Sequence, residues 1–240
     1  MTDRPFEVVC EVEPPTSPDL KHVRHQIGTL GRIADSFLIP DNHIGRATVS
    51  SVAVAHEVQA MGGRSIACLN SRDRNLLGFR RDLLTAAAYG VEELLFVYGD
   101  KPTTGSRTSD LTVRSMIEEV RALGEDPAFA DVPAFRVGTA AGLRPLPAWK
   151  RAADFVFVQV SFSLEALLRW REANPVDVPV YAGVMVIASE NHARRLATAI
   201  PDIDLPAELV ERVADDRPAA RTSERDQRQD HFANRAMSVE

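Results

Sequence analysis

The sequence predicts an α/β fold, a (β/α)₈ TIM barrel whose last strand is missing from this chain. Seven short apolar runs alternate with segments of helical periodicity, a pattern typical of a parallel sheet. The runs are almost continuously apolar, which indicates that both faces of the sheet are covered. Polar residues follow the ends of successive runs. A barrel gathers these ends at one mouth, whereas an open doubly wound sheet, the second possible fold, spreads them along an edge.

The first predicted strand lies within residues 6–15. Val8 and Val9 favour a buried strand, and the two prolines at 14 and 15 end it because proline has no N–H for the ladder. Glu11 is therefore placed at the C-terminal end of a core strand. A helix that starts at Ser17-Pro18-Asp19 follows, with apolar residues at helical spacing up to a glycine at 31.

The remaining chain repeats this alternation, with glycines closing several helices. Further strands are predicted at 34–40, 65–69, 94–98, 134–139, 155–160 and 179–187. Helices are predicted at 48–61, 76–89, 110–123, around Trp149, at 164–173, at 190–199 and from Pro206. We expect residues 1–216 to form one catalytic barrel domain and 217–240 a charged helical tail that belongs to an incomplete final unit.

The composition and charge of the chain disfavour some classes of binding partner. The 240 residues carry a net charge of −6, and no basic run points to nucleic acid. The start of the sequence lacks an apolar leader, and no apolar run approaches the ~18 residues of a membrane span, so we expect a cytoplasmic protein. Cys10 and Cys68 lie in apolar runs, which favours reduced core thiols. The sequence is also compatible with a homo-oligomer.

Several kinds of site are not supported. The sequence has no glycine-rich phosphate fingerprint, no nucleophile elbow, and no metal-binding spacing among its six histidines. Glu11, Asp100 and Gln159 remain, a set that suits proton transfer to a heterocycle. Two simpler interpretations stay open: Glu11 meets water at a strand end, and Asp100 is a turn residue after a glycine.

In a series of short segments the chain resembles the methylenetetrahydrofolate reductase family. The segments, in order, are Glu11-Val12-Glu13-Pro14-Pro15, Asp41-Asn42, Ser71-Arg72-Asp73-Arg74-Asn75, Asp82-Leu83-Leu84, Gly99-Asp100-Lys101-Pro102, Gln159 and Pro179-Val180-Tyr181-Ala182-Gly183-Val184. The resemblance implies a (β/α)₈ barrel that reduces 5,10-methylenetetrahydrofolate to 5-methyltetrahydrofolate. It also implies hydride transfer from FAD that is recharged by NADH or NADPH.

The resemblance also implies roles for single residues. Glu11 is the general acid that protonates N10, and we expect a raised pKa for it in a dry barrel mouth. Asp100 lies beside the pterin and flavin, and Gln159 binds the pterin. Cations expected to bind the folate tail are Arg46, Arg72, Arg74 and Lys101. Residues expected at the cofactor are Asp41, Asn42, Cys68, Tyr98, Ala141 and Lys150.

Three departures from the family concern the flavin. Family members with FAD commonly have a histidine where Cys68 stands and an arginine or threonine where Tyr98 stands. Their polar sequence after the fifth strand is replaced here by residues 139–142. Two interpretations of these departures stay open: NADH passes its hydride directly to the folate, or FAD still binds through backbone groups.

Two further functions are compatible with the same residues. One is a catalytically silent barrel that binds folate or a partner protein, which the missing last strand and the altered flavin positions favour. The other is a pterin reductase that uses a different hydride carrier, such as a deazaflavin. The presence of Glu11, Asp100 and Gln159 argues against the silent barrel, because a domain without chemistry gains nothing from a buried acid and amide.

Overall fold

The computed structural model describes residues 6–123, 126–130, 132, 134–187, 189, 191, 193, 205, 206 and 209. These residues fall into two compact units. The first unit contains the described residues up to 140 together with 148–156, and the second contains 141–147 and those from 157 onward. The tail at 217–240 lies outside the described residues, as do most of the helix predicted at 190–199 and most of the helix predicted from Pro206.

Seven strands form one sheet in the order β1-β2-β3-β4-β5-β6-β7. The strands are β1 (Val9–Glu11), β2 (Ser36–Ile39), β3 (Ser65–Asn70), β4 (Glu93–Val97), β5 (Arg136–Ala141), β6 (Phe155–Val158) and β7 (Val180–Ala182). The pairs from β1–β2 to β4–β5 are parallel. Sequence order and sheet order therefore agree, as a (β/α) barrel requires. No eighth strand follows β7 within the described residues.

Both faces of the central strands are buried, as the apolar runs predict. On one face, alternate residues of β2 to β4 join the core against the helices: Phe37, Ile39, Ala67, Leu69, Leu94 and Phe96. The residues between them face the other way and are also buried: Leu38, Ile66, Cys68 and Leu95. We refer to this second face as the inner face of the sheet.

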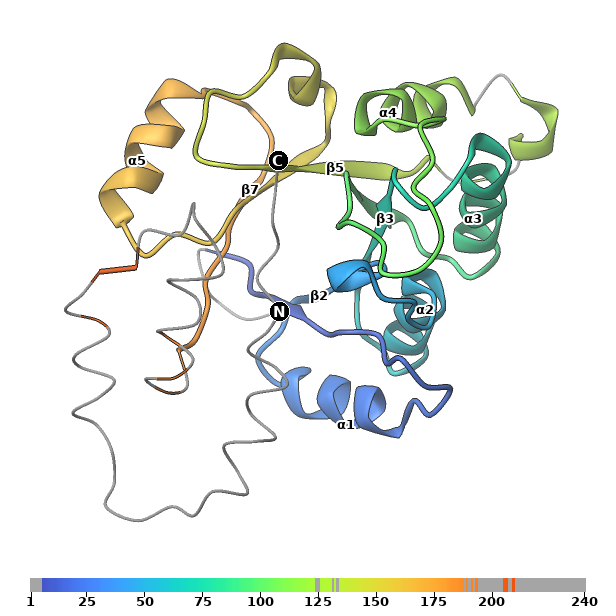
Figure 1. Ribbon diagram of the computed structural model, residues 1–240, viewed down its shortest axis with the longest axis horizontal. Helices are drawn as coiled ribbons and strands as arrows, with labels where there is room; N and C mark the ends of the chain where they lie inside the picture. The colour runs from blue at the N-terminus through green and yellow to red at the C-terminus, as the bar shows by residue number, and fades with distance from the viewer. Residues whose placement is uncertain are drawn as a thin grey trace. The chain divides into compact units, whose positions relative to one another are not determined.

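Four α-helices of the first unit connect its strands: α1 (Lys21–Leu30), α2 (Ser51–Ala60), α3 (Leu76–Ala88) and α4 (Val113–Ala122). Figure 1 shows α2 beside β2 and β3, the strands that it joins. Caps fix two helix starts, since Asn75 accepts from Gly78 N–H at 2.9 Å and Thr112 forms a capping box with Ser115. Within the described residues no helix is both long and apolar enough to cross a membrane.

The second unit holds α5 (Leu164–Ala173) and β7. The buried Trp170 donates its indole N–H to Arg144 O at 3.0 Å, and Asn174 accepts Leu146 N–H at 2.6 Å. These bonds tie the loop after β5 to α5.

Two predicted elements differ from the structure. The strand predicted at 179–187 is only β7, because Val184 and Val186 leave the sheet and are exposed. The segment around Trp149 is a 3₁₀ turn, η4 (Ala148–Ala152). The longer strand was predicted from apolar character alone. Apolar character does not show whether a neighbouring strand is present to pair with these residues.

Candidate functional site

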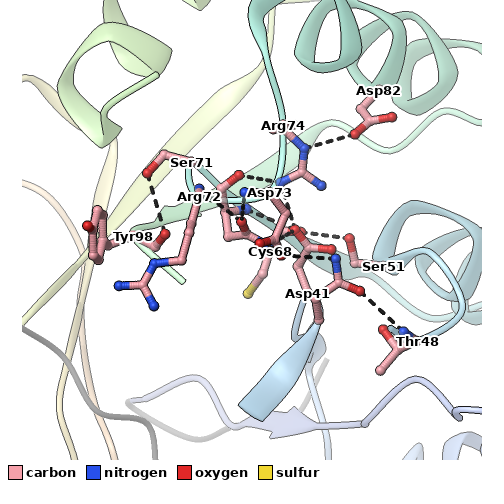
Figure 2. Close-up of polar contacts among 12 residues, drawn as sticks. Asp41, Thr48, Ser51, Cys68, Ser71, Arg72, Asp73, Arg74, Asp82 and Tyr98 are labelled. Atoms are coloured by element: carbon pink, nitrogen blue, oxygen red, sulfur yellow. Dashed lines mark hydrogen bonds and ion pairs between the residues drawn. The ribbon is translucent and has the colours of Figure 1, made fainter. Parts of the chain in front are cut away.

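The polar residues predicted at the ends of β2, β3 and β4 lie together. Parallel strands end at the same edge of a sheet, and the loops after β2, β3 and β4 contact one another at this edge. Figure 2 shows the resulting network of side chains.

Asp41 is the centre of the network. Its Oδ2 accepts from Asn70 N at 2.9 Å, Asn70 Nδ2 at 2.7 Å and an Arg74 guanidinium nitrogen at 2.7 Å. The side chains of Asp41 and Arg74 are only 6% and 12% exposed. Burial opposes the charge of Arg74, but the carboxylates of Asp41 and Asp82 outweigh it and raise the pKa of the guanidinium above its ordinary value. The loops after β2 and β3 are thus joined by a buried ion pair.

Asn70 and Asn42 extend this network. Asn70 Oδ1 accepts the backbone N–H groups of Arg72 and Asp73 at 3.1 and 3.0 Å, which fixes the loop after β3. Both amides donate to Asp73 Oδ2, Asn70 at 2.9 Å and Asn42 at 3.1 Å. Asn42 Oδ1 also accepts Thr48 N–H at 3.2 Å. Asp41 and Asn42 therefore shape the loops, and their predicted contact with a cofactor stays a prediction.

The loop after β2 has a strained backbone. Asn42 has φ 45° and Ile44 has φ 56°, in the left-handed region that β-branched residues rarely adopt. Such strain costs about 1–3 kcal/mol per residue and is concentrated at functional sites. It directs the N–H of Ile44 to Oδ2 of Asp100 at 2.8 Å. The loop after β2 thereby orients the carboxyl group of Asp100.

Gly45 allows this approach of the two loops. A Cβ on Gly45 would stand 1.8 Å from the carbonyl oxygen of Lys101, so only glycine fits. The Gly45 carbonyl accepts both the N–H and the hydroxyl of Thr103, at 2.8 and 2.9 Å. Asp100 lies in the segment that these contacts hold.

His43 lies in the same loop and was missed as a site residue by sequence reasoning. Its side chain is buried, with 5% of its surface exposed. Burial lowers the pKa of the imidazole, and the charge of Asp100 opposes that shift only in part. Its Nε2 has no hydrogen-bond partner within the described residues. The one signal in the sequence was its place directly after Asp41-Asn42.

Cations gather around Tyr98. The Arg72 guanidinium carbon stands 4.4 Å from the centre of the Tyr98 ring, and Arg107 donates to the phenol oxygen at 2.7 Å. Tyr98 is 40% exposed. Sequence reasoning named Arg72 and Tyr98 but not Arg107. The other two predicted cations on these loops, Arg46 and Lys101, are exposed at the rim.

Glu11 faces the inner side of the sheet. It is in register with Leu38, and neighbours in register project to the same face, so Glu11 shares the face of Leu38 and Cys68. Burial raises the pKa of the Cys68 thiol, and the nearby carboxylates of Glu11 and Asp41 raise it further. Both carboxylates therefore lie close to this thiol.

The expected burial of Glu11 is not observed, because its side chain is exposed. β1 is the first strand in the sheet order and pairs with β2 on one side. In a closed barrel the other side of β1 pairs with the last strand, and no such strand occurs within the described residues. The prediction that Glu11 lies in a dry environment is therefore wrong for the described part of the chain.

Three predicted residues lie further along the sheet. Lys150, in η4, donates to the carbonyl of Ala140 at the end of β5, and burial lowers the pKa of its amine. Ala141 is buried, and its carbonyl accepts Gln159 N–H at 2.8 Å in the second unit. Gln159 is half-buried and its Oε1 accepts Val160 N–H at 2.9 Å. A common site for Gln159, Glu11 and Asp100 stays a prediction.

Within the described part of the chain, no group of three or more His, Cys, Asp or Glu residues could hold a metal ion. The arrangement instead combines ionisable side chains with amides at one sheet edge. It can orient a planar polar ligand, with Glu11 and Asp100 three strands apart. At roughly 4.8 Å per strand this spans about 14 Å along a flat sheet, and less where the sheet curves.

Comparison with known proteins gives a family and a fold. A sequence-family profile described as methylenetetrahydrofolate reductase matches residues 7–225. No sequence among curated proteins matches. An uncharacterized protein from Clostridium thermocellum, described as binding two copies of 5-methyl-5,6,7,8-tetrahydrofolic acid, matches with a TM-score of 0.56 and 13% identity over 88% of this chain and 76% of that one.

Two further solved structures are similar. A mutant tryptophan synthase α-subunit from Pyrococcus furiosus matches with a TM-score of 0.51 and 16% identity over 82% of this chain and 85% of that one. The Bacillus cereus spore cortex-lytic enzyme SleL has a TM-score of 0.46 and 12% identity over 74% of this chain, which spans only 49% of that protein. The two matches with a TM-score above 0.5 support the TIM-barrel-like fold, with its last strand absent from the described residues.

Proposed function

Because the chain belongs to the methylenetetrahydrofolate reductase family, we propose that it reduces 5,10-methylenetetrahydrofolate to 5-methyltetrahydrofolate with electrons from NADH or NADPH. The observation that carries this proposal is the family match over residues 7–225, which includes Glu11, Asp100 and Gln159. The reduced folate bound by the Clostridium thermocellum neighbour supports the substrate class.

In the proposed mechanism Glu11 protonates N10 of the folate. The bond between N10 and the methylene carbon then breaks, which leaves an iminium at N5, and a hydride reduces its carbon to the methyl group. An exposed carboxyl ionises near pH 4, so donation near neutral pH needs a raised pKa. We therefore propose that the bound folate itself covers Glu11 and excludes water from it.

Asp100 has a different role in this mechanism. Its carboxyl group is oriented by the N–H of Ile44 at 2.8 Å and lies close to His43. A carboxylate in that position accepts hydrogen bonds from the ring N–H and amino groups of a pterin. We propose that Asp100 holds the pterin ring.

The exposed cations at the rim suit the glutamate tail of folate. Arg46 follows β2 and Lys101 follows β4, and both side chains reach solvent. Arg72 is already stacked on Tyr98. We propose that Arg46 and Lys101 bind the tail carboxylates, which raises affinity without taking part in the chemistry.

The flavin-side positions do not fit FAD well. The Cys68 thiol is buried and held neutral, so it is a weak hydrogen-bond donor. Arg72 stacks on the Tyr98 ring, and Arg107 binds its hydroxyl. We therefore propose that NADH or NADPH delivers the hydride directly to the folate.

An absorbance spectrum of the purified protein tests this cofactor proposal. We expect no bands at flavin wavelengths and no increase in NADH oxidation when FAD is added. Flavin bands that persist after gel filtration would reject direct transfer. A deazaflavin has its own absorbance and would be recognised in the same spectrum.

One observation favours a second function, a catalytically silent barrel that binds folate. Glu11 is exposed, as expected if it has no chemical task. The discriminating measurement is NADH oxidation with methylenetetrahydrofolate by the wild type, Glu11→Gln and Glu118→Gln. Glu118 is a matched control because it is an exposed residue of α4, paired with Arg114 at 2.8 Å.

We expect turnover by the wild type and Glu118→Gln, and a loss of at least a hundredfold in Glu11→Gln, in line with the general acid–base contribution. Folate binding without turnover by the wild type would favour the silent barrel. Full turnover by Glu11→Gln would remove Glu11 from the mechanism.

A further inference from the structure

Most of the buried polar atoms without partners lie in loops at the edge where Asp100 lies. Within the described residues four buried side-chain nitrogen or oxygen atoms lack a hydrogen bond: His43 Nε2, Thr48 Oγ1, Ser65 Oγ and Arg72 Nε. Three of them belong to the loops after β2 and β3, and the fourth is at the start of β3. Folded proteins satisfy nearly all such groups, so a cluster of exceptions calls for a physical reason.

His43 is the most pronounced case. It is 5% exposed, while residues on both sides of it have positive φ without being glycine, Asn42 at 45° and Ile44 at 56°. The N–H of Ile44 binds Asp100 at 2.8 Å, which holds the His43 backbone beside that carboxyl group. The strained loop that orients Asp100 therefore also places an imidazole whose Nε2 gains no hydrogen bond there.

We propose that His43 binds the reduced folate, its Nε2 forming a hydrogen bond with the pterin ring next to Asp100. This inference rests on the proposed function. Because Nε2 is shielded in the free protein, the imidazole turns when the folate binds, and the bond satisfies an atom that was unpartnered before. The missing hydrogen bond of His43 Nε2 in the free protein thus favours folate binding.

The chemistry of the imidazole suits a pterin. Burial keeps His43 neutral, so its two nitrogens are one donor and one acceptor, whereas the carboxylate of Asp100 only accepts. A pterin edge presents alternating donors and acceptors. His43 and Asp100 together can match such an edge, which a single carboxylate cannot.

The test compares His43→Phe with His43→Gln and with His25→Phe as control. Phenylalanine fills the ring volume without a hydrogen-bonding atom, and glutamine keeps a polar group near the Nε2 position. His25 is an exposed histidine of α1 and lies outside the site. Titration calorimetry measures binding of 5-methyltetrahydrofolate and, separately, of NADH, and a thermal scan of the free protein gives Tm.

We expect His43→Phe to bind 5-methyltetrahydrofolate roughly tenfold more weakly than the wild type, as for the loss of one buried hydrogen bond. Its affinity for NADH should be unchanged, and its Tm should be equal or higher because an unsatisfied buried nitrogen is removed. His43→Gln should keep most of the affinity, and His25→Phe all of it. A structural histidine would give the opposite pattern, a lower Tm with unchanged affinity.

Unchanged folate affinity in His43→Phe, or a loss confined to NADH, overturns the inference. Should His43→Phe not fold, the ¹⁵N resonance of His43 Nε2 in the wild type decides: it must shift when 5-methyltetrahydrofolate is added. Wild-type protein that binds this folate through His43 but has no turnover contradicts the proposed reaction and supports the inference. Wild-type protein that binds no folate overturns both.

Discussion

The backbone N–H of Ile44 donates to Oδ2 of Asp100 at 2.8 Å, across 56 positions of sequence. Ile44 reaches this oxygen with φ at 56°, a conformation unfavourable for a β-branched residue. The loop after β2 therefore gives up stability in order to fix a carboxyl group that follows β4. This relationship makes Asp100 a residue whose orientation and charge can be separated by mutation.

Asp100→Asn should separate charge from orientation. The asparagine carbonyl still accepts the N–H of Ile44, so the loop keeps its conformation while the negative charge is lost. We expect Tm within a few degrees of the wild type and kcat/KM lowered at least tenfold. Asp100→Ala removes both functions and should lower Tm as well. Equal stability of the two variants would contradict the orienting role of the Ile44 bond.

Gly45→Ala should be far more damaging than an ordinary glycine substitution. The added Cβ would stand 1.8 Å from the Lys101 carbonyl oxygen, at φ 65°. Gly90→Ala is the matched control, since Gly90 has φ 70° and nothing within 4 Å of its Cβ position. The control should cost about 1–2 kcal/mol in the free energy of unfolding.

Gly45→Ala adds to that strain the separation of the loops after β2 and β4, so activity should fall with stability. Urea unfolding and steady-state kinetics measure the two effects. Similar results for both variants would show that the close approach at Lys101 is dispensable.

Arg74→Met should destabilise the first unit. The substitution removes the cation that pairs with Asp41. The carboxylate of Asp41 stays buried, because its side chain is only 6% exposed. Removing one partner of a buried ion pair costs roughly 3–5 kcal/mol. Arg114→Met, at the exposed pair with Glu118, is the control and should hardly change the free energy of unfolding.

The double variant Asp41→Asn/Arg74→Met tests the cause. It no longer buries an unpaired charge, so it should recover part of the lost stability. The alternative is that the two side chains act independently. In that case the losses in the free energy of unfolding for Asp41→Asn and Arg74→Met would add up in the double variant.

The strands could be predicted because each apolar run ends at residues that cannot continue it. The prolines after Glu11 and the glycine before Asp100 mark such ends, and the observed β1 and β4 stop within three residues of them. The end of β7 could not be predicted in this way, because the apolar residues continue beyond it. Val184 and Val186 are as apolar as strand residues, and only the absence of a paired neighbour in the described structure separates them from β7.

Sequence reasoning named several residues at this edge of the sheet but not their contacts. Glu11, Asp41 and Asp100 were found because charge at the end of an apolar run is unusual. Their partners come from other strands, as Asn70 does for Asp41, and a one-dimensional pattern does not pair residues that far apart. His43 was missed because nothing in the sequence predicts left-handed backbone at Ile44.

The two cysteines should differ in reactivity. Burial and the carboxylates of Glu11 and Asp41 raise the pKa of the Cys68 thiol, whereas Cys10 is half-buried. The thiolate is the reactive form, so Cys68 should resist iodoacetamide at pH 8 in the folded protein while Cys10 reacts first. Mass spectrometry of the labelled peptides measures both rates. Faster labelling of Cys68 would mean that the inner face of the sheet is open to solvent.

His43 should make the free protein sensitive to acid. Its pKa in the folded state is lowered by burial, so the unfolded chain takes up a proton on His43 at a higher pH than the folded protein does. Above about pH 6.5, the ordinary pKa, both states are neutral there and no stability is lost. As the pH falls below that value, the unfolded state gains a proton first. The free energy of unfolding should then fall by up to about 1.4 kcal/mol per pH unit from this residue.

His43→Phe removes this dependence, and His25→Phe, at an exposed histidine, should leave it in place. Thermal unfolding between pH 8 and pH 5 measures the difference: the wild type and His25→Phe should lose Tm faster than His43→Phe as the pH falls. Parallel curves for all three proteins would place His43 in a solvated environment. Binding of 5-methyltetrahydrofolate should leave the wild-type curve at least as steep and extend the loss to lower pH, because a hydrogen bond from the ligand to Nε2 opposes protonation of His43 in the folded state.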